Sequence, residues 1–197
     1  MENKKANYKL GLDISTSIIG VCLFKEDKFF KFYHLDLTKV KCVFEKSKLY
    51  EKLISEIFEE YNFTSVYIED TLQSFSRGLS SAKTLMTLAK FNGIVSYITH
   101  NISGLIPDYI NVNTARKTLG IKIDKNSNID KKEQVLRWVD SDLEKKFDWP
   151  KKTISRGKNI GVVKFEKFCY DISDAYVICK AGIIINEQST KSDWVFW

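Results

Sequence analysis

The feature that most constrains this chain is the stretch from Tyr8 to Phe24, YKLGLDISTSIIGVCLF. An apolar strand ends in Asp13, crosses a short turn of small hydroxyl residues, and returns as a second apolar strand near Ile18. A carboxylate at the end of a buried strand is costly unless something binds it, because an unpaired buried charge loses its hydration. The sequence therefore raises the question of what Asp13 binds.

The pattern of the rest of the chain predicts an α/β protein. Three antiparallel strands are expected first, with Glu26-Asp27 as a tight hairpin connection. Helical periodicity then alternates with short β-rich runs. The expected elements are strands 8–13, 18–25 and 28–34, a helix over 49–62, the strand SVYIED, a helix over 81–101, the strand DYINVN, a short basic helix ARKTLG capped by Thr114, a helix over 131–147, and a last helix beginning at YDISDAY.

Length and composition bound the class. At 197 residues and 44% hydrophobic content, the chain is expected to form one globular domain. No apolar run reaches the length of a membrane span, so we expect a cytoplasmic protein without membrane contact. The four cysteines are scattered, without a CxxC pair, and only two histidines accompany them. This argues against a zinc site and makes Cys22 and Cys179 plain core residues.

The net charge of +6 is regional. The range 116–167 holds 15 Lys and Arg against 8 Asp and Glu, whereas the rest of the chain is almost neutral. A basic segment beside a balanced body is typical of a polyanion partner, since lysine and arginine release counterions from phosphates. A solvated lysine-rich face is the alternative. The stretch from Trp149 to Phe168 is expected to be a loop or hairpin.

Three further acids lie where they can meet Asp13. Glu69 ends the strand SVYIED, and the carboxyl ends of strands in open α/β sheets are where ligands gather. Asp171 and Asp174 are three residues apart, on one face of the last helix. If the first and fourth strands are neighbours in a mixed sheet, all four acids meet at one edge. Oxygen ligands without nearby His or Cys favour Mg²⁺ or Mn²⁺.

Each of these residues has a simpler explanation when taken alone. Asp13 could form a turn, Glu69 could be a solvated strand end, and the DISD pair could complement a helix N-terminus. The cations Lys131, Lys132 and Arg137 could be the wet face of a helix. The four acids together favour the metal-site interpretation.

Four motifs, GLDISTSIIGV, VYIED, KEQVLRWV and YDISDAY, occur in an order that resembles the RuvC Holliday-junction resolvases, and the bacteriophage type in particular. The resemblance runs from Tyr8 to about Ile185. It implies the ribonuclease H-like fold, with a mixed five-stranded sheet and helices on both faces. It also implies a homodimeric Mg²⁺-dependent endodeoxyribonuclease that resolves four-way DNA junctions by paired symmetric nicks.

By this resemblance, Asp13, Glu69, Asp171 and Asp174 match the family's metal-binding carboxylates. They would hold two Mg²⁺ ions roughly 4 Å apart, replaceable by Mn²⁺, with Asp13 as the bridge. Lys132 matches a lysine near the scissile phosphate. The residues expected to contact DNA are Arg77, Arg116, Lys117, Lys131, Lys132 and, as an apolar wedge at the junction centre, Phe75 or Leu72.

Three segments lie outside the four motifs. The range 140–168 is a basic insertion relative to compact bacterial members, and the tail from Trp194 to Trp197 is aromatic. The helix 82–98 carries an apolar stripe with small residues, suited either to the core or to a dimer face; its members are Ala82, Leu85, Met86, Ala89, Gly93 and Ile94.

Two other functions remain possible. One is a fork or flap nuclease, or a binding protein, of the same fold. The other is an actin-like or sugar-kinase-like ATPase, in which the Ser15-Thr16 turn would hold phosphate. That fold normally needs two such domains, and the turn lacks a glycine partner, so the length of this chain counts against it.

Overall fold

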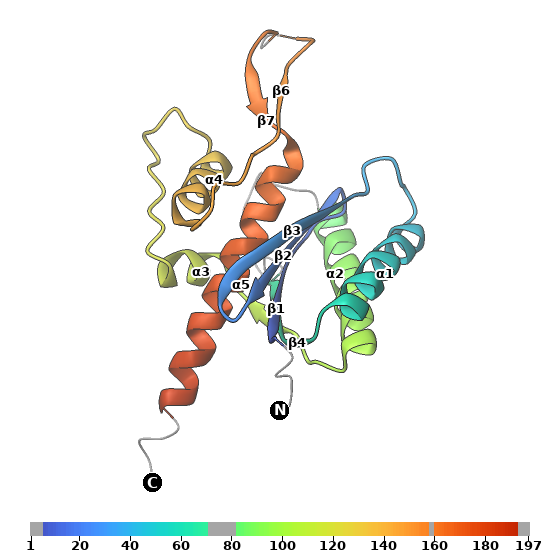
Figure 1. Cartoon of the computed structure of the whole chain (residues 1–197). Helices are drawn as coiled ribbons and strands as arrows, with labels where there is room; N and C mark the ends of the chain where they lie inside the picture. The colour runs from blue at the N-terminus through green and yellow to red at the C-terminus, as the bar shows by residue number, and fades with distance from the viewer. Residues whose placement is uncertain (1–5, 71–81, 158–159, 193–197) are drawn as a thin grey trace.

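The computed structural model describes residues 6–70, 82–157 and 160–192, and its centre is a five-stranded sheet (Figure 1). The strand order is β3-β2-β1-β4-β5. β1, β2 and β3 pair antiparallel, whereas β1, β4 and β5 run parallel. The strands are β1 (Tyr8–Ile14), β2 (Ile18–Lys25), β3 (Lys28–Asp36), β4 (Phe63–Glu69) and β5 (Asp108–Ile110). The predicted mixed sheet and α/β class are confirmed.

Helices cover both faces of this sheet, as predicted (Figure 1). On one face lie α1 (Val43–Glu60) and α2 (Ala82–Ser103), and on the other lie α3 (Val112–Thr118), α4 (Lys131–Asp142) and α5 (Lys167–Ser192). Each face has its own apolar cluster. Leu10, Leu12 and Ile54 belong to the first, and Cys22, Tyr67 and Ala175 to the second. This split follows from the strand period of two, which sends alternate side chains to opposite faces.

The pairing of β1 with β4 decides where the functional edge lies. Leu12 pairs with Ile68 in this parallel ladder, so the next residues, Asp13 and Glu69, lie at the same end of adjacent strands. Parallel strands bring their carboxyl ends to one edge. The expected adjacency of the first and fourth strands is confirmed.

Two turns give the β1–β2–β3 meander its shape. Ser15 Oγ donates to the Ile18 carbonyl (2.7 Å) and accepts from the Ile18 amide (3.0 Å), which closes the return after Asp13. At the second turn Glu26 and Asp27 have φ of 48° and 66°, the left-handed values of a two-residue hairpin turn. Both connections agree with the sequence prediction.

α5 packs unusually close to the sheet because two strand residues lack a side chain. A Cβ on Gly20 would overlap the carbonyl of Asp171, and one on Gly11 would overlap the Cβ of Cys179. These contacts hold the N-terminal half of α5 against β1 and β2. The backbone of Asp171 is thereby placed at the sheet edge where Asp13 lies.

α2 presents a different face to the core than its small-residue stripe suggested. Its buried residues are Phe91, Asn92, Val95, Ser96 and Thr99, and Thr99 Oγ1 is 2.6 Å from the hydroxyl of Tyr50 on α1. Most of the stripe is exposed, with Met86 58% accessible. Phe91 and Val95 join the apolar cluster on the α1 side of the sheet. The polar residues Asn92, Ser96 and Thr99 share their face, so the apolar pattern of the sequence did not reveal it.

Some element boundaries differ from the sequence prediction. α1 begins at Val43, six residues early, and α4 ends at Asp142 because Leu143 turns extended. Only 108–110 of DYINVN forms a strand. The cap of α3 is Asn111, whose side-chain oxygen accepts from the amides of Asn113 (2.9 Å) and Thr114 (3.4 Å), so Thr114 is not the cap. An Asn preceding the helix satisfies these amides as well as Thr would.

Part of the basic segment forms a small antiparallel hairpin of β6 (Lys151–Thr153) and β7 (Val163–Phe165). It projects beyond the N-terminal end of α5 (Figure 1). A hairpin was one of the two expected forms. Within the described ranges, no helix is both long and apolar enough to span a membrane.

Candidate metal and DNA-cleavage site

The four acids singled out in the sequence come from β1, β4 and α5 and lie at one edge of the sheet. Asp13, Asp171 and Asp174 are only 8%, 8% and 7% exposed. Asp13 points to the face that α5 covers, because it shares that face with Gly11. Glu69 shares the same face with Tyr67, which belongs to the α5-side cluster. Strand alternation therefore turns both strand acids toward the helical pair.

Burial and mutual repulsion act on all four carboxyl groups. Burial, followed by the charges of Glu69, Asp174 and Asp171, raises the pKa of Asp13 well above its ordinary value. Burial and the charge of Asp174 likewise raise the pKa of Glu69, although a hydrogen bond with Asp13 opposes this shift. Such closely coupled acids share their protons. Because each ionised carboxylate disfavours ionisation of its neighbours, the four acids disfavour full ionisation of the cluster.

The helical pair is affected in the same direction. Burial raises the pKa of Asp171 to about 6 against the opposing charge of Lys132. Burial also raises the pKa of Asp174, which Lys132 and Arg116 oppose. Lys132 and Arg116 do not fully offset the effect of burial, because the pKa values of Asp171 and Asp174 remain raised. This edge of the sheet could therefore accept further positive charge.

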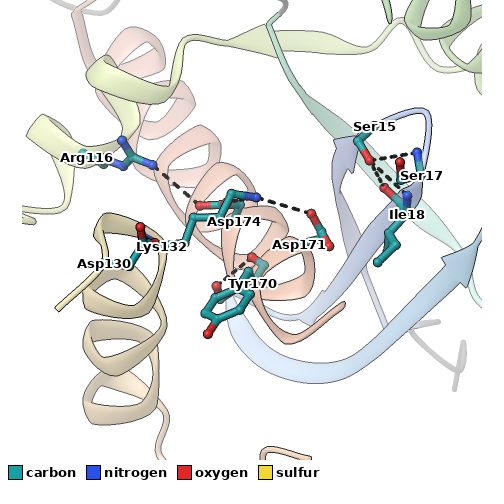
Figure 2. A network of polar contacts seen from close by, with 10 residues as sticks. Ser15, Ser17, Ile18, Arg116, Asp130, Lys132, Tyr170, Asp171 and Asp174 are labelled. Atoms are coloured by element: carbon teal, nitrogen blue, oxygen red, sulfur yellow. Dashed lines mark hydrogen bonds and ion pairs between the residues drawn. The ribbon is translucent and has the colours of Figure 1, made fainter. Parts of the chain in front are cut away.

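Two cations approach the pair from separate helices (Figure 2). Lys132 Nζ, from α4, lies 3.6 Å from Asp171 Oδ1 and 3.9 Å from Asp174 Oδ2. Arg116 Nη2, from α3, lies 3.7 Å from Asp174 Oδ1. At these N···O distances the groups form ion pairs, but they are too far apart for hydrogen bonds. Burial lowers the pKa of Lys132, and Asp171, Asp174 and Asp13 together reverse that effect, so its net pKa is raised and it stays charged.

The chemistry of this donor set fits a hard divalent cation. All four donors are carboxylates, and Asp174 Oδ1 is buried without a hydrogen-bond partner among the described residues. A buried acceptor left unmatched is costly and is a natural position for a metal bond. Within the described part of the chain, no three His, Cys, Asp or Glu side chains already converge into a closed metal-binding group.

The remaining predicted site residues fall into three groups. Lys117 and Lys131 lie beside the site, on the walls of a cavity between α3 and α4. Arg137 pairs with Glu133 of its own helix (2.7 Å), which supports the wet-face interpretation for that residue. Phe75, Leu72 and Arg77 fall within 71–81, outside the described residues, as does the tail from Trp194.

Two contributors to the site were not identified from sequence. Asn92 on α2 is buried and its Nδ2 donates to the backbone carbonyl of Glu69 (3.4 Å), supporting the end of β4 from the opposite face. A polar residue among apolar neighbours was its only signal. Lys46 on α1 donates to the Thr16 carbonyl in the turn after Asp13.

Comparison with solved structures identifies the fold of this chain. No protein-family model and no curated protein matches the chain. Among solved structures, Thermus thermophilus RuvC in complex with a Holliday junction substrate aligns with a TM-score of 0.62 and 12% identity, over 93% of this chain and 96% of that one. A second Thermus thermophilus RuvC structure aligns with a TM-score of 0.57 and 13% identity, over 93% and 97%. The chain thus has the ribonuclease H-like fold of the RuvC structures.

Proposed function

We propose that this protein is a divalent-metal-dependent endodeoxyribonuclease that nicks four-way DNA junctions. The observation that carries the proposal is the meeting of Asp13, Glu69, Asp171 and Asp174 at one sheet edge, beside the charged Lys132. The RuvC fold and the junction in one of the aligned structures add support for the substrate. Acid clusters of this composition are suited to phosphodiester hydrolysis with Mg²⁺.

In this proposal Asp13, Glu69, Asp171 and Asp174 would hold two Mg²⁺ ions, which Mn²⁺ could replace. When bound, the metal ions lower the pKa of a water and stabilise the leaving oxygen. Lys132 supplies a fixed positive charge beside the reacting phosphate, where negative charge builds up. Arg116 offsets part of the charge of Asp174 from the other side and so reduces its repulsion of the incoming strand. Close packing of α5 at Gly20 keeps these groups in register.

The direct test compares labelled four-way, fork, flap and linear DNA in Mg²⁺ and in EDTA. We expect paired nicks on the four-way junction that require the metal, because the acid cluster alone repels the phosphate. Cleavage limited to forks or flaps would indicate a branched-DNA nuclease of another selectivity. ATP hydrolysis without nicking of any DNA would contradict the proposal.

Paired nicks require two active sites, and we propose that the solvent-facing stripe of α2 forms the homodimer contact. A two-fold dimer would match the symmetry of the junction. Met86 is exposed, and a Cβ on Gly93 would meet no atom within 4 Å, so a second helix could approach closely.

The dimer proposal is checked by Met86→Glu, which should shift the protein from dimer to monomer in sedimentation. The matched control is Phe44→Glu, which changes an apolar side chain that is 71% exposed on a different helix, α1. Monomeric wild-type protein at micromolar concentration, or equal behaviour of both variants, would refute this contact.

A further inference from the structure

A cavity of about 750 Å³ lies next to the acid cluster, between α3, α4 and the segment that joins them. Its size is within the range of sites that bind small molecules, about 300–1,000 Å³. One wall comes from α3, through Arg116 and Lys117, and another from α4, through Lys131 and Gln134. None of the reactions described above needs this space.

Positive charge dominates the cavity walls. The lining residues include five cations, Arg116, Lys117, Lys122, Lys125 and Lys131, and one acid, Asp124. The carboxylate of Asp124 is engaged locally, since its Oδ1 accepts from the Asn126 amide (2.8 Å). Among the described residues, Arg116 is the one cation of the five that makes an ion pair. An anionic ligand would therefore meet uncompensated positive charge.

The floor of the cavity is apolar. Ile121 is buried, and Ile123 and Ile129 are partly buried, with Ile123 packed against the α5-side core cluster. A phosphate alone would make no use of this floor, whereas a nucleotide combines a phosphate with a flat, largely apolar base. The composition of the walls and floor matches these two parts.

The cavity is preformed by hydrogen bonds from one side chain. Gln134 Oε1 accepts from the Asp124 amide (2.9 Å), and its Nε2 donates to the carbonyls of Asp124 (2.9 Å) and Ile129 (2.8 Å). These bonds hold the connecting segment against α4. A wall that is ordered before binding loses less conformational entropy when the ligand arrives.

The cavity is also linked to the acid cluster through shared residues. Arg116 pairs with Asp174, and Lys132 faces Asp171 and Asp174 (Figure 2). Arg116 also lines the cavity, as does Lys131, the residue before Lys132. A strand whose phosphate lies at the acids would place a neighbouring nucleotide within reach of this cavity.

We infer that the cavity between α3 and α4 binds one nucleotide of the DNA strand being cut, close to the scissile phosphate. The lysines hold its phosphate and the isoleucine floor contacts its base. This inference rests on the proposed nuclease function. It makes the cavity a determinant of where along a strand the nick falls, through contact with a base that the acids do not touch.

Binding can be tested without cleavage, using a fluorescein-labelled thymidine tetranucleotide in EDTA. The double variant Lys122→Gln with Lys125→Gln should bind about tenfold more weakly, and each lost phosphate contact should reduce the salt slope by about 0.7. Both lysines are exposed, so folding should be unaffected. The matched control is Lys48→Gln with Lys52→Gln, exposed on α1 across the sheet. Equal binding by both double variants would overturn the inference.

Base contact is tested by moving an abasic site through the nucleotides beside the nick in a junction. An abasic site at one of these positions should slow cleavage by the wild-type protein about fivefold. The same abasic site should cause a smaller loss of rate in Ile123→Ala, because this variant has already lost the contact between the base and the cavity floor. If an abasic site slows cleavage equally at every position, the cavity does not contact a particular base.

Two further results separate related outcomes. Thymidine monophosphate whose binding depends on Lys122 and Lys125, but which does not compete with the tetranucleotide, would make this a site for a free nucleotide and overturn the strand assignment. Wild-type protein that nicks no DNA, but whose tetranucleotide binding depends on Lys122 and Lys125, would refute the nuclease function and leave the cavity assignment intact.

Discussion

Asp174→Asn is expected to slow nicking of the four-way junction by at least about 100-fold, the loss typical of removing one well-placed electrostatic group. Asp174 is buried beside Arg116 and Lys132, and its Oδ1 has no hydrogen-bond partner within the described residues. Asparagine keeps the shape of the side chain but removes the charge that would bind a dication. DNA binding should be unchanged or tighter, because a negative charge near the phosphates disappears.

The measurements are single-turnover cleavage with excess protein in Mg²⁺ and junction binding in EDTA. Glu51→Gln is the matched control, since it removes an exposed acid from α1 on the opposite face of the sheet. It should cleave at the wild-type rate. Wild-type cleavage by Asp174→Asn would exclude this residue from the site.

The same assay with Lys132→Ala separates charge stabilisation from DNA binding. We expect the cleavage rate to fall about tenfold or more while junction affinity changes little, because Lys132 faces the acids at 3.6 Å and 3.9 Å. An unchanged rate would remove Lys132 from the site, and equal losses in rate and affinity would make it a binding residue.

Asp171→Asn is expected to make the metal-free protein more stable at pH 7.5. In the folded protein the pKa of Asp171 is raised from 3.8 to about 6, first by burial, so ionisation of this group opposes folding. At about 1.4 kcal/mol for each pKa unit, the stability lost is about 3 kcal/mol. Removing the charge should raise the melting temperature in EDTA by roughly 5 °C or more.

The pH dependence has a definite sign. Because the folded pKa lies above the unfolded one, the stabilising contribution is complete below pH 3.8 and is lost as pH rises through about 6. The raised pKa values of Asp13 and Asp174 act in the same direction. The advantage of Asp171→Asn over wild type in EDTA should therefore be small at pH 4.5 and large at pH 7.5.

Differential scanning fluorimetry of wild type, Asp171→Asn and Glu51→Gln at these pH values makes the comparison. Mg²⁺ should raise the melting temperature of wild type more than that of Asp171→Asn, because a ligand that binds only the folded state stabilises it. A lower metal-free melting temperature for Asp171→Asn at pH 7.5 would contradict the electrostatic account.

The positions of the acids could be predicted because they depend on local rules. Asp13 and Glu69 end strands whose alternation is visible in the residues, and Asp171 and Asp174 share a helix face by their spacing. The mixed five-stranded sheet was expected from the resemblance to the RuvC resolvases, and the structure confirms it. The buried face of α2 could not be predicted, because it includes the polar Asn92 and Thr99. Their partners, the backbone carbonyl of Glu69 and the hydroxyl of Tyr50, come from β4 and α1 and are known only from the packing.

The amino-acid pattern was enough to predict most of the elements, the four acids and the basic character of 116–167. Three features became visible only in the folded chain. Arg116, and not Lys117, pairs with Asp174, and Gly20 leaves room for the backbone of Asp171. Lysines of the α3–α4 connection line a cavity. Local patterns arise from the backbone period of each element. Distances between side chains far apart in the chain depend on how the elements pack, which the backbone period does not specify.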